Sequence, residues 1–148
     1  MKRILFLSVI LFVMSSSAES QIKPRINHVA IYVVKLQRSV DFYTNVFGLD
    51  SIPEPFHDNK HAWYRIGPGV ALHVIEGAPQ PKEYFQNNHI CFSVGSVDAF
   101  VGKLKSNNIP WVNAKGEKMQ ITNRVDGVKQ IWVADPDGYW IEVNDAKD

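Results

Sequence analysis

Short stretches of alternating apolar and polar residues recur along this chain. In the segment 26–34, His28, Ala30 and Tyr32 alternate with β-branched residues. Because successive side chains of a strand point to opposite faces, this pattern predicts a half-buried strand. Similar patterns predict strands over 61–66, 70–75, 89–94, 129–134 and 139–143. The segment 49–56 is predicted to be extended because its prolines exclude a helix, and 111–114 is predicted to be a short strand.

Two segments instead repeat their apolar residues at helical spacing. The first ends before Gly48, a typical C-terminal stop, and its apolar residues are Leu36, Val40, Tyr43 and Phe47. The second follows Ser96, which has the right chemistry for an N-cap, and its apolar residues are Val97, Phe100 and Leu104. Each helix follows the first strand of a group, so the order is strand, helix and then further strands.

The order of elements occurs twice, and the two occurrences share sequence. N-H-V-A-I-Y-V at 27–33 matches N-H-I-C-F-S-V at 88–94. L-H-V at 72–74 follows a turn-like G-P-G, and I-E-V at 141–143 follows D-P-D-G, which fits a type I turn. Internal similarity of this kind predicts a duplicated strand–helix–three-strand module. We place the two modules at 25–77 and 87–145 of a single domain, with the proline-containing segment 78–82 as the linker.

Each module carries one metal-capable side chain early and one late: His28 and His73 in the first, His89 and Glu142 in the second. All four have apolar neighbours in sequence, so alternation places them together on the face opposite the core. Imidazole nitrogens and carboxylate oxygens are good ligands for a divalent metal, which would also offset the cost of burying a carboxylate. A single strand histidine is more often a hydrogen-bonded structural residue. The shared register of the four favours a metal site.

The N-terminal segment 1–20 differs from the rest of the chain. Lys2 and Arg3 precede an apolar run over 4–14 and a stretch of small residues, which is the order of a secretory signal peptide. The run is shorter than the roughly 20 residues that span a bilayer, so we expect a secreted or periplasmic protein without membrane attachment after processing. The remaining chain is nearly neutral and has no basic block, which argues against nucleic acid as a partner.

Several further residues have open interpretations. His57 and His61 have a spacing of four, but the turn signal between them indicates surface residues or the edge of a substrate site. Cys91, the only cysteine, shares a face with His89, and a small buried thiol is the more typical role. Arg65 and Arg124 could bind a carboxylate or phosphate, or could simply be solvated at strand ends.

The aromatic residues have two open roles as well. They could line an organic pocket or pack in the core, and they are Tyr32, Trp63, Trp132 and Trp140.

The chain resembles the vicinal oxygen chelate superfamily, which includes glyoxalase I, bleomycin-resistance proteins, methylmalonyl-CoA epimerase, fosfomycin-resistance enzymes and extradiol dioxygenases. The resemblance covers nearly all of 25–145 and is carried by I-N-H-V-A-I-Y-V, S-V-D-F-Y-T-N-V-F-G-L, V-A-L-H-V-I-E-G, N-N-H-I-C-F-S-V and V-A-D-P-D-G-Y-W-I-E-V-N-D. It implies an α+β fold in which two βαβββ modules form a curved mixed-sheet cup. It also implies a divalent metal (zinc, nickel, cobalt, manganese or iron) on His28, His73, His89 and Glu142, a small-molecule substrate, and a homodimer.

One position departs from the pattern of relatives. Bacterial-type glyoxalase I usually has glutamate at the place of His73, and the epimerases usually have glutamine. The resemblance implies a metal-dependent lyase or isomerase similar to lactoylglutathione lyase-related proteins. Because histidine stands at position 73, Glu142 is its single carboxylate ligand and its candidate base. One alternative is an extradiol-type dioxygenase that holds iron with His28, His89 and Glu142. Another is a drug-binding protein without catalysis.

Overall fold

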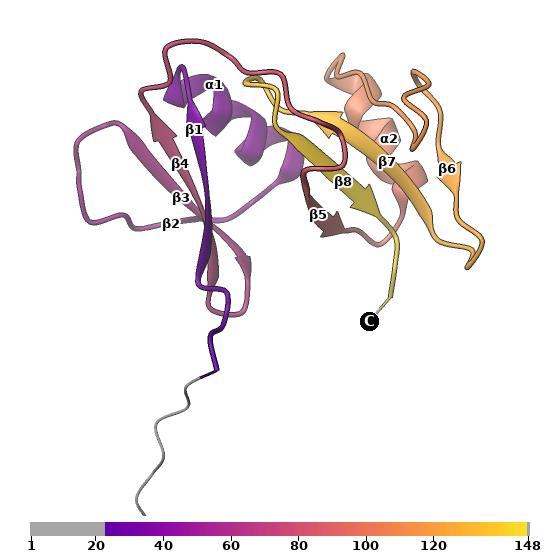
Figure 1. Cartoon of the computed structure of the whole chain (residues 1–148), viewed down its shortest axis with the longest axis horizontal. Coiled ribbons are helices and arrows are strands. Elements are labelled where there is room, and N and C mark those ends of the chain that lie inside the picture. The colour runs from indigo at the N-terminus through magenta and orange to yellow at the C-terminus, as the bar shows by residue number, and fades with distance from the viewer. Residues whose placement is uncertain (1–22, 148) are drawn as a thin grey trace, which may run out of the picture.

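The computed structural model describes residues 23–147. The segment 1–20, where a signal peptide is predicted, lies outside this range. The described residues form two four-stranded mixed sheets and two helical segments (Figure 1). Among these residues, none of the helices has the length and apolar character needed to cross a membrane.

The two sheets have the same topology, which confirms the predicted α+β fold built on a duplication. The first has the order β1-β4-β3-β2, with strands β1 (His28–Val33), β4 (Val70–Glu76), β3 (His61–Gly67) and β2 (Ser51–Ile52). The second has the order β5-β8-β7-β6, with strands β5 (His89–Ser93), β8 (Trp140–Asn144), β7 (Lys129–Ala134) and β6 (Thr122–Asn123). In each sheet the first and last strands of the module pair in parallel, and the other pairs are antiparallel.

Each helix follows the first strand of its module, as predicted. Helix α1 (Leu36–Asp41) continues into a π-helical segment, η1 (Phe42–Phe47). This segment ends at Gly48, which takes the left-handed conformation (φ 71°) that glycine adopts without steric cost. Helix α2 (Val97–Ser106) begins after Ser96, whose Oγ accepts a hydrogen bond from the Ala99 N–H at 3.2 Å.

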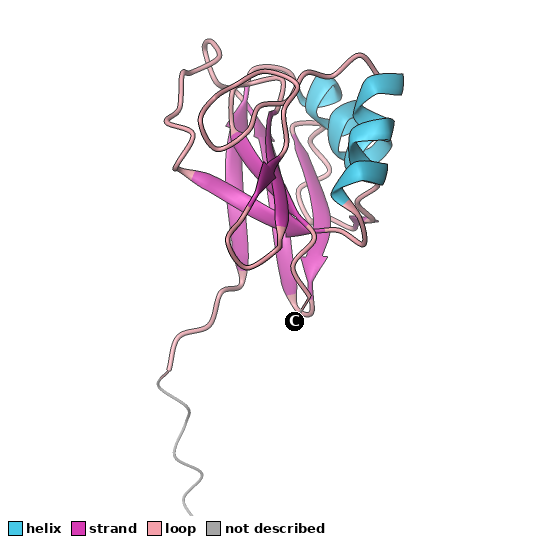
Figure 2. Ribbon diagram, turned by 90° about the vertical axis from the view of Figure 1, so that its right-hand side faces the viewer, coloured by secondary structure: helices cyan, strands magenta, loops and turns pink. Residues whose placement is uncertain are grey.

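Both helical segments lie on one side of the strands (Figure 2). The strand residues on this side are buried, as Val33, Leu72 and Val143 show, and they join the helices in one core that spans both modules. The ring of Phe47 contacts the second module directly through Phe92, with 5.5 Å between ring centroids. The opposite face of each sheet, which we call the inner face, carries the alternate residues and is left open by the helices.

Two predicted segments differ from the structure. Within 49–56 only Ser51 and Ile52 pair as a strand. The segment 111–114 is not a strand and forms only isolated bridges through Val112. The reason is local, because Asn113 Oδ1 accepts hydrogen bonds from the N–H groups of Lys115 and Glu117 at 2.9 Å and turns the chain away.

The D-P-D-G turn between β7 and β8 joins the two modules. Asp137 Oδ1 accepts a hydrogen bond from the Val34 N–H at 2.8 Å, and Asp135 Oδ2 accepts one from the Tyr43 hydroxyl at 2.9 Å. Asp135 Oδ1 also accepts the N–H groups of Asp137 and Tyr139. Both carboxyl groups are buried, and burial raises the pKa of Asp135 to about 6 despite these hydrogen bonds. A sequence motif read as a turn is therefore also the polar contact between modules.

We expect the substitution Asp135→Asn to remove part of the pH dependence of stability. The folded pKa is above the ordinary value, so as pH rises from about 4 to about 6 the unfolded chain loses this proton first and the folded state loses stability. This loss, at most about 3 kcal/mol at 1.36 kcal/mol per pKa unit, is complete above pH 6. The asparagine keeps an acceptor oxygen for the two N–H groups but has no proton to lose.

Urea unfolding at pH 4.5 and 7.5 measures the effect. The decline in unfolding free energy between the two pH values should be smaller in Asp135→Asn than in the wild type. An equal decline in both proteins would show that Asp135 has no raised pKa.

Candidate metal centre

The first two predicted ligands, His28 and His73, lie next to each other on the inner face of the first sheet. In the register of β1 and β4, Ala30 pairs with His73, so the two histidines are diagonal neighbours on adjacent strands. Their rings stack with 4.2 Å between centroids and 5° between planes. Trp63 of β3 stacks on the other side of His73 at 3.9 Å. His73 is thus held between two parallel rings, and burial together with neighbouring His28 lowers its pKa, which favours the neutral imidazole.

The other two predicted ligands, His89 and Glu142, lie on the inner face of the second sheet. His89 Nε2 is 3.0 Å from Glu142 Oε2. The second carboxylate oxygen, Oε1, accepts a hydrogen bond from Asn144 Nδ2 at 3.1 Å, so the carboxylate of this buried residue is held from two sides.

An oxygen acceptor fixes Nδ1 of both first-strand histidines. His28 Nδ1 lies 2.9 Å from Asn27 Oδ1, and His89 Nδ1 lies 3.0 Å from the Gln86 carbonyl oxygen. Because these oxygens only accept, each Nδ1 donates its proton to the oxygen, and Nε2 is the ring nitrogen that can face a further partner. For His89 this creates a requirement: a neutral Nε2 and the Glu142 carboxylate are both acceptors, so their 3.0 Å contact needs a proton or a metal ion between them.

The two pairs are related by the duplication. Trp63 is paired across the strands with His73, and Trp132 is paired with Glu142. Trp132 packs edge-on against His89, with 5.9 Å between ring centroids. The structure thus contains two equivalent half-sites, each with two ligands and a tryptophan.

The half-sites do not meet within one chain. Among residues 23–147, no group of three or more histidine, cysteine, aspartate or glutamate side chains has an arrangement that could hold a metal ion. Both half-sites lie on faces that the helices leave open: His28, Ala30 and Tyr32 are exposed on β1, and His89 and Cys91 on β5. The structure brings together the two predicted ligands of each module, and it does not bring together the predicted set of four.

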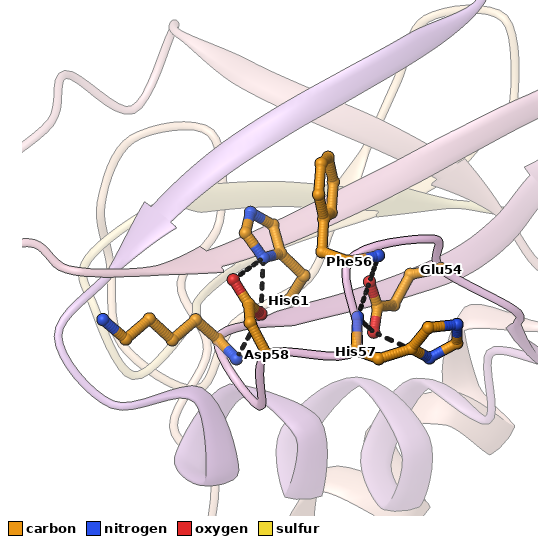
Figure 3. A network of polar contacts seen from close by, with 6 residues as sticks. Glu54, Phe56, His57, Asp58 and His61 are labelled. Carbon is orange, nitrogen blue, oxygen red and sulfur yellow. Dashed lines mark hydrogen bonds and ion pairs between the residues drawn. The ribbon is translucent and has the colours of Figure 1, made fainter.

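His57 and His61 lie in and beside the loop that precedes β3 (Figure 3). His61 Nδ1 contacts Asp58 Oδ1 at 2.9 Å, and the His61 ring lies 4.4 Å from that of Phe56. The His57 N–H donates to Glu54 Oε1 at 2.9 Å, and its largely exposed ring lies 3.9 Å from the same oxygen through Nδ1. His57 is therefore a surface residue, whereas the partly buried His61 lies on the inner face, two residues before Trp63 on the same strand.

The other residues considered in the sequence lie partly on the surface and partly at the half-sites. Arg124 donates to Asp126 Oδ2 at 2.6 Å and is a surface residue. Cys91 was expected to be buried, but it is exposed on the inner face, because this face of β5 is open in a single chain. Partial burial of the thiol and the neighbouring Glu142 carboxylate raise its pKa to about 11. Trp132 is buried, and Tyr32 is half exposed.

Two cavities lie near these residues. One of about 240 Å³ adjoins His73 and is also lined by Trp63 and Arg65. A larger cavity of about 510 Å³ is lined by residues 78–84, which include the linker, and by none of the four predicted ligands. The histidine partners Asn27 and Gln86 were not predicted from the sequence. The repeated N-H dipeptide was a signal for Asn27, but nothing in the sequence pointed to the Gln86 carbonyl.

Comparison with known proteins agrees with this architecture. Residues 25–143 match the sequence profile of the Glyoxalase/Bleomycin resistance protein/Dioxygenase superfamily. The chain is 30% identical to Glyoxylase I 4 of Arabidopsis thaliana over 125 residues, covering 80% of this chain and 68% of that protein. It is 31% identical to a lactoylglutathione lyase of Salmonella typhimurium over 134 residues, covering 84% and 94%. The solved structure of the oxidase ChaP-H2 has the same fold (TM-score 0.69, 18% identity, covering 85% and 96%). The chain therefore belongs to the Glyoxalase/Bleomycin resistance protein/Dioxygenase superfamily.

Proposed function

We propose that this protein is a metal-dependent lyase or isomerase that acts on a small organic substrate with two neighbouring oxygens. The ligands are His28, His73, His89 and Glu142. The observation that carries the proposal is the pair of equivalent half-sites, in which an oxygen acceptor fixes Nδ1 of both first-strand histidines and so assigns metal binding to Nε2. The relatives that are lactoylglutathione lyases support the reaction class.

We further propose that two copies of the chain complete each site. The half-sites of one chain are separate, and both open on the side of the sheets away from the helices. Exposed aromatic residues accompany them, with Tyr32 50% and Phe56 57% exposed, which is typical of a surface that a partner covers. A homodimer with twofold symmetry would place the His28–His73 pair of each chain against the His89–Glu142 pair of the other.

The protein residues have separable roles in this proposal. The metal, when bound, supplies a Lewis acid that polarises the two substrate oxygens. Glu142 accepts the proton that leaves the substrate carbon, and Asn144 holds the other oxygen of the same carboxylate in place. Asn27 and Gln86 keep the histidines in the tautomer that leaves Nε2 free. Trp63 and His28 fix the ring of His73 between them.

One observation favours a second candidate, an oxygenase. The His73 ring is stacked between two parallel rings, which suits a residue that positions His28 as well as one that binds metal itself. The remaining three residues are the two histidines and one carboxylate that non-haem iron enzymes use. In this case iron would be retained without His73.

We also propose that the protein is exported, on the basis of the signal-peptide pattern in residues 1–20. Determining the N-terminal sequence of protein recovered from an export-competent host tests this. A mature chain that begins after about residue 18–20 is expected, and an intact Met1 in exported material would contradict cleavage.

Mixed dimers test whether two chains share each site. We expect His28→Ala/His73→Ala and His89→Ala/Glu142→Gln to bind no metal when each is purified alone. When the two are co-expressed with different peptide tags and the heterodimer is isolated, one complete site is restored, so metal content should return to about half of the wild-type value. Elemental analysis of protein prepared without chelators or a His tag measures this.

Sites formed within one chain would give no restoration in the heterodimer. Analytical ultracentrifugation of each variant shows whether it still forms a dimer. A wild-type protein that is monomeric and yet holds one metal per chain would also rule out the shared site.

Substitution His73→Ala separates the two candidate functions. A lyase-like site with four ligands should bind one divalent metal per chain in the wild type and, because His73 is then itself a ligand, lose more affinity without it than the roughly 10- to 100-fold that loss of an outer-shell partner costs. The oxygenase should retain iron in His73→Ala and consume oxygen with a catechol. Metal competition titrations and an oxygen electrode give the two readouts. Wild-type protein that takes up no metal even after reconstitution would overturn both functions.

Substitution Glu142→Gln tests the assigned base. On a substrate that the wild type converts, with the hemithioacetal of methylglyoxal and glutathione as the first to try, turnover should fall by about 100-fold or more, because the amide cannot accept the proton. Metal content is measured in the same samples, and turnover is compared at equal metal occupancy. Full turnover in Glu142→Gln would contradict the assignment.

A further inference from the structure

The cavity beside His73 has a composition that differs from the rest of the inner face. Its volume is about 240 Å³, which is below the usual 300–1,000 Å³ of ligand pockets and suits a small molecule. Apolar contacts come from Trp63 and from short or branched side chains on either side. The lining residues are Asn27, Ile52, Trp63, Arg65, Gly67, Gly69, Val70, Ala71 and His73.

The polar groups of this cavity are mainly hydrogen-bond donors. No aspartate or glutamate lines it. The Arg65 guanidinium has no carboxylate within 4.0 Å and no hydrogen-bond partner among residues 23–147. Asn27 Oδ1 is already paired with His28, so its amide N–H₂ remains as a donor. A second guanidinium lies at the rim, since Arg25 Nη1 is 3.8 Å from the position that a Cβ on Gly69 would occupy.

The duplication shows that the fold does not need this arginine. Trp63 corresponds to Trp132, because they pair with His73 and Glu142, so Arg65, two residues on, corresponds to Ala134. Across the strands, Arg65 faces Ala71, whereas Ala134 faces Trp140. The first module therefore has a long cation on β3 opposite a small residue on β4. The second has a small residue on β7 opposite a large aromatic residue on β8. The exchange leaves room beside Arg65 for a ligand.

We propose that this cavity binds a carboxylate of the substrate through Arg65. The guanidinium presents its N–H groups in the planar arrangement that matches a carboxylate. Arg65 and His73 are diagonal neighbours on the inner face, with Cβ atoms roughly 7–8 Å apart. The bound carboxylate is thus separate from the two oxygens held at the metal. The substrate class is a small organic acid with vicinal oxygens and one further carboxylate, a statement that rests on the function proposed above.

Two probes that differ in one carboxylate test the proposal. L-Malate has a 2-hydroxy acid group and a further carboxylate, and L-lactate has only the 2-hydroxy acid group. With zinc-loaded wild-type protein, malate should bind at least about tenfold more tightly than lactate, as expected for a charge-assisted hydrogen-bonded pair. Arg65→Met should lose most of this ratio with unchanged zinc affinity. Arg65→Lys should keep part of it. Calorimetric titration measures both ligands.

Arg38→Met is the matched control, because Arg38 is an exposed arginine of α1, on the helix side, whose Nη2 donates to the Pro136 carbonyl oxygen at 3.0 Å. It removes the same charge and should leave the malate-to-lactate ratio unchanged. An unchanged ratio in Arg65→Met would overturn the proposal. An equal loss in both variants would also overturn it, since the effect would then come from net charge alone.

Metal-free protein separates this proposal from the proposed function. Succinate, which has no vicinal oxygens, should shift the Trp63 indole N–H resonance in wild-type protein and in Arg38→Met, and should not do so in Arg65→Met. This result would support the carboxylate site even if zinc fails to bind. The same succinate shift in Arg65→Met would exclude Arg65 as the binding group whether or not the protein holds a metal.

Discussion

Burial of only one face of each sheet is the constraint on which the rest of this structure depends. Both helices pack on the same side, and the core they form with the strands joins the two modules. Because side chains alternate along a strand, burying Ile31 and Val33 places His28 and Tyr32 on the opposite side. A shift of one residue in any strand would bury the histidines and expose the core. The chemistry of the inner face is thus tied to the packing of the outer one.

Buried polar contacts between the modules also hold the two sheets in this arrangement. Asp135 and Asp137 accept hydrogen bonds from both modules and connect the turn before β8 to the start of α1. Satisfied buried carboxylates of this kind hold a defined geometry, because any other placement would leave them without partners. They fix how the sheets lie side by side, and therefore that the two half-sites open outward separately.

Each half-site is incomplete, and both lie on the side of the sheets that the helices leave open. The contact between His89 Nε2 and Glu142 Oε2 needs a positive charge between two acceptors, and His28 and His73 present imidazole nitrogens on an open surface. Within residues 23–147 of one chain, neither pair belongs to a group of three or more histidine, cysteine, aspartate or glutamate side chains that could hold a metal ion. A metal shared by two copies would meet both requirements together. The duplication supplies two equivalent half-sites for this purpose. Arg65 and its counterpart Ala134 show that the surroundings of the first half-site have diverged from those of the second, which is where we propose that the substrate carboxylate binds.

The sequence alone determined the duplicated α+β fold, the positions of most strands and both helices, and the placement of His28, His73, His89 and Glu142 on the face opposite the core. These follow from periodicity and repetition, which are local properties of the chain. Tertiary structure decided what depends on distant contacts: the exposure of Cys91, the place of His61 on the inner face, the loss of the strand at 111–114 to the hydrogen bonds of Asn113, and the separation of the two ligand pairs. Alternation specifies which face a side chain occupies, but only the packing of one sheet against its neighbours determines which faces meet.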